Sequence, residues 1–195
     1  MAIEKKLSTD RIHYPMTAVR MRSYYIEAGR MDSPNNILFT SHTPKRIVVG
    51  LTPASAYNGN IGQSPFNFKP FKLRNIYLTL NNRVMPSRPY NLDWTSSYAT
   101  AYVDMLEGLG IAHSDTSNGI TPAMYKNGFT FFVFDISPTV HSPDLFDVIR
   151  QGNVSLKLEF SERTPAEGLY VIVYAEYDSI LSIDQNRTPY LDTSL

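Results

Sequence analysis

Three acidic residues near the C-terminal end of the sequence are the best-placed candidates for chemistry. They lie in the stretch GLYVIVYAEYDSILSIDQNR (residues 168–187), and on a strand Glu176, Asp178 and Asp184 would point to the same face. Glu176 and Asp178 would then lie roughly 7 Å apart, within the range that separates the two carboxyl groups of inverting glycosidases. Any two acidic residues at positions i and i+2 share this spacing, and nothing in the sequence indicates the apolar pocket that a general acid needs. Of the two interpretations, a hydrolytic site or the polar face of a long strand, we favour the strand.

The opposite face of this stretch is apolar, as expected for a strand that starts in a core. Its side chains are Val171, Val173, Ala175, Tyr177, Leu181 and Ile183. A strand that leaves the core and continues to an exposed edge or an interface would combine these two faces. We therefore expect the three carboxylates to face solvent or a neighbouring subunit.

Other reactive groups are scarce. The chain contains no cysteine, which excludes disulfides, thiolate metal ligands and a cysteine nucleophile. His13, His42, His113 and His141 fall in predicted loops far from one another, whereas zinc sites use closely spaced ligand pairs. No nucleophile elbow, P-loop or dinucleotide-binding glycine pattern occurs. We expect no metal, no cofactor and no enzymatic activity.

The charge balance argues against nucleic acid as a direct, specific partner. Aromatic and basic residues do alternate in FNFKPFKLR (residues 66–74), a pattern that could stack single-stranded bases. The 18 basic and 18 acidic residues cancel, however, and nucleic acids or anionic membranes demand a basic surplus. Neither a signal peptide nor a membrane span is evident, so we expect a protein that is not secreted.

Apolar alternation and turn residues predict a chain made mainly of strands. The predicted strands cover residues 17–29, 45–51, 73–80 with a return at 83–85, 126–138, 154–160 and 168–187. The first alternates around Val19, Met21 and Tyr24, and Asn81-Asn82 supplies the tight turn of the hairpin. An aromatic, proline-rich loop is predicted between residues 52 and 71.

Two helices interrupt the strands. Residues 96–110 carry apolar side chains at helical spacing, namely Tyr98, Tyr102, Met105, Leu106 and Leu109. Residues 141–153 have a serine cap, a proline at the first helical position and a terminal glycine. Two short helices among so many strands predict an all-β sandwich or barrel. We divide the chain into an N-terminal arm (residues 1–18) and one domain (residues 19–195).

Six segments occur in an order that resembles a known family. They are PKRIVVGL, AYNGN, SPFNFKPF, YKNGFTFFVFDISP, RQGNVSLKLEFSE and VIVYAEYDSILSIDQNR. They are similar to the C-terminal part of the major capsid proteins of Polinton (Maverick) elements and their adintovirus-type relatives. The resemblance extends over residues 11–190 and is most specific over residues 125–187.

The resemblance implies the second half of a double jelly-roll capsid protein, in which three copies form a pseudo-hexagonal capsomer. This chain would be a single jelly roll of two antiparallel sheets with one or two short inserted helices, from an excised, truncated or domesticated copy. It implies self-association as a trimer or higher assembly with other capsid subunits, in a virion or in the nucleus or cytoplasm of a host cell. A lone jelly roll lacks half of the ring, so a normal capsomer does not follow.

We place the interface of such an assembly on exposed aromatic residues. The predicted set is Tyr57, Phe66, Phe68, Phe71, Trp94 and Tyr190. The alternative is a carbohydrate- or ligand-binding module without catalysis, because jelly rolls also serve as lectins. Trp94 beside Asp93 is then the best local candidate for stacking a sugar.

Overall fold

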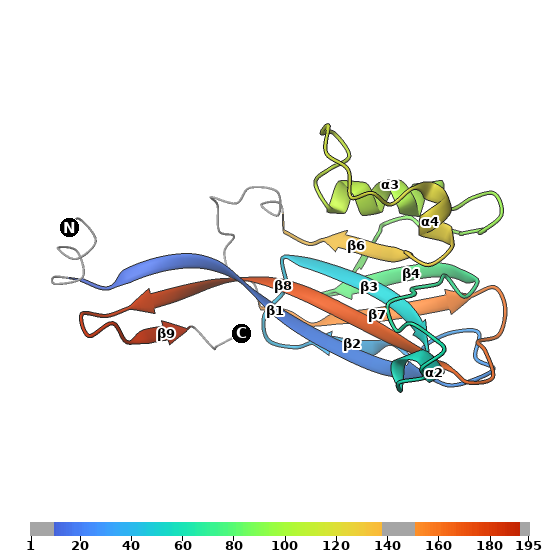
Figure 1. Cartoon of the computed structure of the whole chain (residues 1–195), viewed down its shortest axis with the longest axis horizontal. Coiled ribbons are helices and arrows are strands. Elements are labelled where there is room, and N and C mark those ends of the chain that lie inside the picture. The colour runs from blue at the N-terminus through green and yellow to red at the C-terminus, as the bar shows by residue number, and fades with distance from the viewer. Residues whose placement is uncertain (1–9, 138–150, 192–195) are drawn as a thin grey trace.

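Two antiparallel sheets pack face to face in the computed structural model, which describes residues 10–137 and 151–191 (Figure 1). The strands are β1 (Ile12–Ile26), β2 (Asn36–Phe39), β3 (Arg46–Pro53), β4 (Leu73–Leu80), β5 (Arg83–Met85), β6 (Phe131–Asp135), β7 (Val154–Phe160), β8 (Leu169–Ile183) and β9 (Pro189–Leu191). The helices are α2 (Ala54–Tyr57), α3 (Ala99–Gly108) and α4 (Pro122–Lys126).

The strand order is that of a jelly roll. One sheet, here called the long sheet, has the order β1-β8-β3-β6 with β9 paired to β8; the other, the short sheet, has the order β2-β7-β4-β5. The chain passes back and forth between the two sheets, so most neighbouring strands are distant in sequence. The predicted all-β jelly-roll sandwich with short inserted helices is confirmed.

Alternating side chains of β7 and β8 fill the space between the sheets. On β7, Val154, Leu156 and Leu158 are buried as their spacing predicts. On β8 the odd-numbered residues from 169 to 177 are buried, while their even-numbered neighbours are only partly covered. Full burial of a leucine or valine side chain contributes about 1.5–3 kcal/mol. These two rows therefore hold the sheets together.

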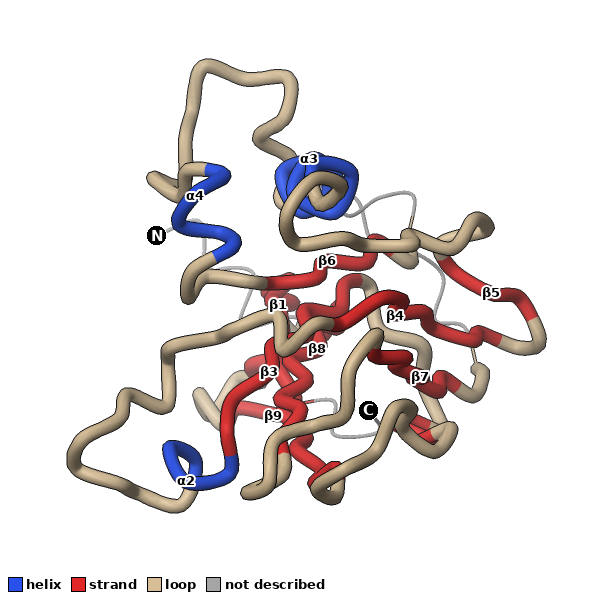
Figure 2. Tube along the Cα trace, turned by 90° about the vertical axis from the view of Figure 1, so that its right-hand side faces the viewer, coloured by secondary structure: helices blue, strands red, loops and turns tan. Residues whose placement is uncertain are grey.

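The connections follow local sequence signals to different degrees. Asn81 and Asn82 both have positive φ, 45° and 68°, and close the predicted hairpin between β4 and β5. The helix predicted over residues 96–110 is confirmed as α3, which packs over β6 (Figure 2). The helix predicted over residues 141–153 falls mostly outside the described residues. None of the helices in the described ranges is long and apolar enough to cross a membrane.

Two short helices occupy segments that we predicted as loop or strand. α2 is a single turn inside the predicted aromatic loop. α4 starts at a capping residue, since the Thr121 side chain accepts a hydrogen bond from the Met124 backbone N–H, with Pro122 as the first helical residue. α4 takes up Lys126, so β6 starts only at Phe131, five residues later than predicted.

The longest strands, β1 and β8, extend past the sandwich. They pair residue by residue from Ile12–Ile183 to Ile26–Leu169, and their far ends form, with β9, a projecting ribbon (Figure 1). We use "ribbon" for residues 12–15, residues 180–183 and β9. β1 therefore runs across the boundary predicted at residue 18, because β8 offers backbone partners to residues 12–18.

Candidate functional site

Two carboxylates of β8 are paired with Lys45, just before β3, and with Arg46, the first residue of β3. Lys45 Nζ lies 3.0 Å from Asp178 Oδ1, and Arg46 Nη1 lies 3.4 Å from Glu176 Oε2. Arg46 Nε also lies 3.5 Å from Asp135 Oδ1 on β6. The prediction that Glu176 and Asp178 face solvent is wrong, because their side chains are only 19% and 13% exposed. Contact with a neighbouring subunit stays a prediction.

The strand register explains this pairing. Arg46 stands opposite Glu176 of β8 on one side and opposite Asp135 of β6 on the other. The arginine therefore joins three adjacent strands of the long sheet. Glu176 and Asp178 contact cations of their own sheet, and this arrangement stabilises the sheet rather than presenting two carboxylates to a substrate.

Asp184 does not share a face with Glu176, since β8 ends at Ile183. Its Oδ1 accepts hydrogen bonds from the backbone N–H groups of Asn186 and Thr188, both at 2.9 Å. The Tyr190 hydroxyl donates to Oδ2 at 3.2 Å. The Thr188 hydrogen bond, together with those from Tyr190 and Asn186, lowers the pKa of Asp184. This carboxylate therefore closes the turn between β8 and β9.

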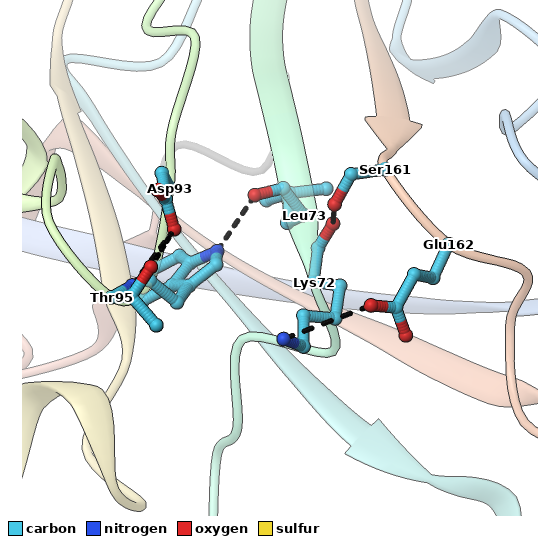
Figure 3. A network of polar contacts seen from close by, with 7 residues as sticks. Lys72, Leu73, Asp93, Thr95, Ser161 and Glu162 are labelled. Carbon is cyan, nitrogen blue, oxygen red and sulfur yellow. Dashed lines mark hydrogen bonds and ion pairs between the residues drawn. The ribbon is translucent and has the colours of Figure 1, made fainter.

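Trp94 is a core residue and cannot stack a sugar. Its side chain is only 5% exposed, and Nε1 donates a hydrogen bond to the Leu73 carbonyl at 2.7 Å (Figure 3). The indole also contacts the rings of Tyr98, Tyr125 and Phe132. The prediction of Trp94 as a stacking or contact surface is wrong, because neighbours on β4, α4 and β6 enclose it.

Asp93 lies at the surface beside this buried ring and organises a turn. It accepts hydrogen bonds from the Thr95 backbone N–H at 2.9 Å and from the Thr95 hydroxyl (Figure 3). The Ser96 hydroxyl donates a further hydrogen bond to it at 2.8 Å. The hydrogen bonds from Thr95 and Ser96 lower the pKa of Asp93 to about 2. The carboxylate thus holds the backbone that leads into α3.

The rest of the predicted interface set divides into buried and exposed members. Phe68 is buried against Gly50, where an added Cβ would lie 2.7 Å from the ring, and Phe71 packs against the core. Tyr57, Phe66 and Tyr190 are exposed, Phe66 by 76%. Contact of these three with a partner stays a prediction.

The three exposed aromatic residues lie at opposite ends of the molecule. Tyr57 stacks on Tyr170 at the start of β8, with ring centroids 3.9 Å apart. Tyr190 pairs with Ser182 near the end of the same strand. Twelve residues of extended chain span about 40 Å. The predicted interface is therefore two surfaces, one around α2 and one on the ribbon.

A further apolar surface lies on β1 and was not predicted from the sequence. Val19, Met21 and Tyr25 are exposed on the outer side of the long sheet. The inner side instead carries Arg20 and Arg22, whose guanidinium groups lie over the rings of Tyr177 and Phe39. The alternation of Val, Arg, Met and Arg does not show which set of side chains faces the core. The register with β8 determines this.

Two clefts are lined by polar side chains that pair with one another. In a cleft of about 450 Å³ on the short sheet, Asn75 and Tyr77 donate to Glu159 at 3.1 and 3.3 Å. In a smaller cleft of about 180 Å³ beside α3, burial and then a hydrogen bond to Asp104 raise the pKa of Tyr90. Within the described residues, no group of three or more His, Asp or Glu could hold a metal ion.

The chain is similar in sequence to a nematode protein. It is 43% identical over 185 residues to the uncharacterized protein F54H12.2 of Caenorhabditis elegans, a match that covers 93% of this chain and 44% of that protein. The chain therefore spans less than half the length of this relative. No family model matches the chain.

Solved structures with a similar fold come from virus particles. A chain in the cryo-EM structure of the Sputnik virophage aligns with a TM-score of 0.57 at 15% identity, covering 95% of this chain and 39% of its own. PBCV-1 VP54 aligns with 0.59 at 12% identity, covering 96% and 53%. A chain of the PBCV-1 virus capsid model aligns with 0.56 at 12% identity, covering 93% and 51%. At these identities the likeness establishes the fold.

Proposed function

We propose that this chain is a structural, capsid-type protein whose jelly roll associates with copies of itself and with other capsid subunits. The observation that carries the proposal is a jelly-roll strand order, like that of chains in virus particles, combined with large apolar side chains on the outer surface. The acidic residues that could have formed an active site are instead paired with Lys45 and Arg46. A non-enzymatic, cofactor-free role agrees with this pairing.

Within capsid proteins, the proposed type is that of Polinton elements and adintoviruses, with this chain as the second half of a double jelly roll. The segments quoted from the sequence support it, and so does a chain that spans about half of PBCV-1 VP54. In this proposal the chain assembles as a trimer or higher oligomer and resides in a virus-like particle or in the nucleus or cytoplasm of its host. A particle of this kind also calls for at least two different contact surfaces, in keeping with Tyr57 and Phe66 at one end and Tyr190 at the other.

Sedimentation velocity over a range from low micromolar to near-millimolar protein tests self-association. We expect the average sedimentation coefficient to rise with concentration. Phe66→Ser should weaken association about fivefold or more, because a well-packed aromatic contact contributes on the order of 1–2 kcal/mol. Ile37→Ser is the matched control, since Ile37 is also apolar and largely exposed but lies on β2 of the short sheet. A wild-type chain that stays monomeric throughout would overturn the proposal.

A further inference from the structure

The outer edge of β1 is a long, open edge of a sheet. β1 pairs with β8 alone among the described strands, along all 15 of its residues and without a break in register. Natural sheets protect such edges with short strands, bulges, prolines, charged side chains or a covering segment. β1 has no lysine and no bulge; its protecting residues are Pro15, Arg20 and Arg22. An edge of this length is a template for another strand.

On β1, apolar side chains face solvent on the outer side, whereas the charged side chains lie on the inner side. Val19 and Met21 are 45% and 64% exposed on the outer side, whereas Arg20 and Arg22 fold inward over aromatic rings. Both arginines remain exposed residues, but their ring contacts hold the guanidinium groups on the inner side, so the outer side of the edge presents apolar side chains. Exposed apolar residues along an open edge mark an interaction surface.

A second copy of β1 complements this edge in one register. The midpoint of β1 is Val19, so an antiparallel pair with a two-fold axis at Val19 is the register that uses the whole strand. In it Arg20 stands opposite Ala18 and Arg22 opposite Met16, so no like charges are directly opposed. Just outside the strand, Arg11 of each copy stands opposite Glu27 of the other. A two-fold axis at Arg20, Met21 or Arg22 would instead place arginines opposite one another.

The same register accommodates the ribbon. Residues 12–15 project past the sandwich in each copy, as Figure 1 shows. With the axis at Val19 they pair with residues 23–26 of the other copy, which lie on the body of its long sheet. Each projecting ribbon is thereby supported along the edge of its partner's sandwich.

We propose that two copies of this chain join edge to edge through β1, antiparallel and with the two-fold axis at Val19, to form one continuous sheet. This inference rests on the proposed self-association and names one of its contact surfaces. A symmetric contact of this kind closes at two copies, so a larger assembly requires a second surface.

Cysteine cross-linking tests the register, because the chain has no cysteine of its own. Directly opposed residues of an antiparallel pair have Cα atoms about 4.5–5.5 Å apart, within reach of a disulfide. We expect Val19→Cys to give a disulfide-linked dimer under mild oxidation. Met21→Cys is the matched control. Residue 21 stands opposite Thr17 of the other copy, and the two copies of residue 21 lie about 14 Å apart. Since Met21 is the more exposed of the two, random collision would favour the control instead.

Two further measurements fix the interpretation. A mixture of Thr17→Cys and Met21→Cys chains should yield mainly the mixed dimer. Val19→Lys, which keeps the fold because the side chain is exposed, should weaken dimerisation about tenfold or more by placing two like charges at the axis. A thermal transition at the wild-type temperature verifies that each variant is folded.

The outcomes separate this inference from the proposed function. Wild-type oligomers in which Met21→Cys links as readily as Val19→Cys would overturn the β1 register while leaving self-association in place. Wild-type chains that stay monomeric and do not link through Val19→Cys would overturn both.

Discussion

Trp94 is a core residue, although it follows the exposed Asp93 in the sequence. The indole is enclosed by aromatic rings and donates to the Leu73 carbonyl at 2.7 Å. We expect Trp94→Ala to lower the free energy of unfolding by about 3–5 kcal/mol, through the lost burial and the cavity it leaves. Trp94→Phe should cost less, about 1–3 kcal/mol, because it mainly leaves the buried Leu73 carbonyl without its hydrogen bond. Urea unfolding measures both; a Trp94→Ala chain with wild-type stability and weakened self-association would restore Trp94 to the interface.

Residue roles were harder to predict than residue burial. The alternation of β8 correctly separated Val171 and Val173 from Glu176 and Asp178, because one strand fixes which side chains share a face. What each face meets depends on the neighbouring strands, and the sequence does not contain the register that places Arg46 opposite Glu176. For the same reason Trp94, next to a polar turn, was placed on the surface.

At the level of elements, α3 is held against β6 by a close contact at a glycine. A Cβ added at Gly108 would lie 2.6 Å from Val133 Cγ1 and 2.9 Å from Val133 Cβ. In a helix, Gly→Ala ordinarily stabilises by about 1 kcal/mol. Here we expect Gly108→Ala to destabilise the chain by about 1–3 kcal/mol, since α3 must move away from the sheet.

A double-mutant cycle isolates this contact. In a Val133→Ala background, Gly108→Ala should be neutral or stabilising, and the coupling between the two sites should exceed about 1 kcal/mol. Gly62→Ala serves as the control for a glycine without positive φ and with no close carbon neighbour. Stabilisation by Gly108→Ala in the otherwise wild-type chain would contradict the contact.

Elements with strong periodicity or a defined turn were predicted, and short ones were not. β7, α3 and the Asn81-Asn82 hairpin follow from local patterns that need no partner. α2 has four residues and α4 has five, too few for a helical period to emerge. The start of β1 was missed because residues 12–18 become a strand only through pairing with β8.

For the molecule as a whole, the jelly roll explains why β1 lies in two environments, the sandwich and the projecting ribbon. Near residues 22–26, β1 lies over the sandwich, and Ile26 is part of the core; at residues 12–16 the same strand lies on or beside the ribbon and is largely exposed. Backbone hydrogen bonds without an apolar layer beneath them open more readily. A single ladder between two strands should therefore differ in stability from one end to the other.

Hydrogen exchange at two protein concentrations tests this gradient together with its consequence for assembly. In dilute, monomeric protein we expect the amide hydrogens of residues 12–14 and 16 to exchange at least about tenfold faster than those of residues 22–26; Pro15 has no amide hydrogen. At high concentration, β1 pairing joins residues 12–16 to residues 22–26 of the other copy and should slow exchange most at residues 12–16, because these are the less protected segment in the monomer. Val19→Lys provides the reference, since it should keep the dilute pattern at both concentrations. Uniform protection along β1 in the monomer would show that the ribbon is stable by itself. It would contradict the inference that the ribbon is stabilised by pairing with a second copy.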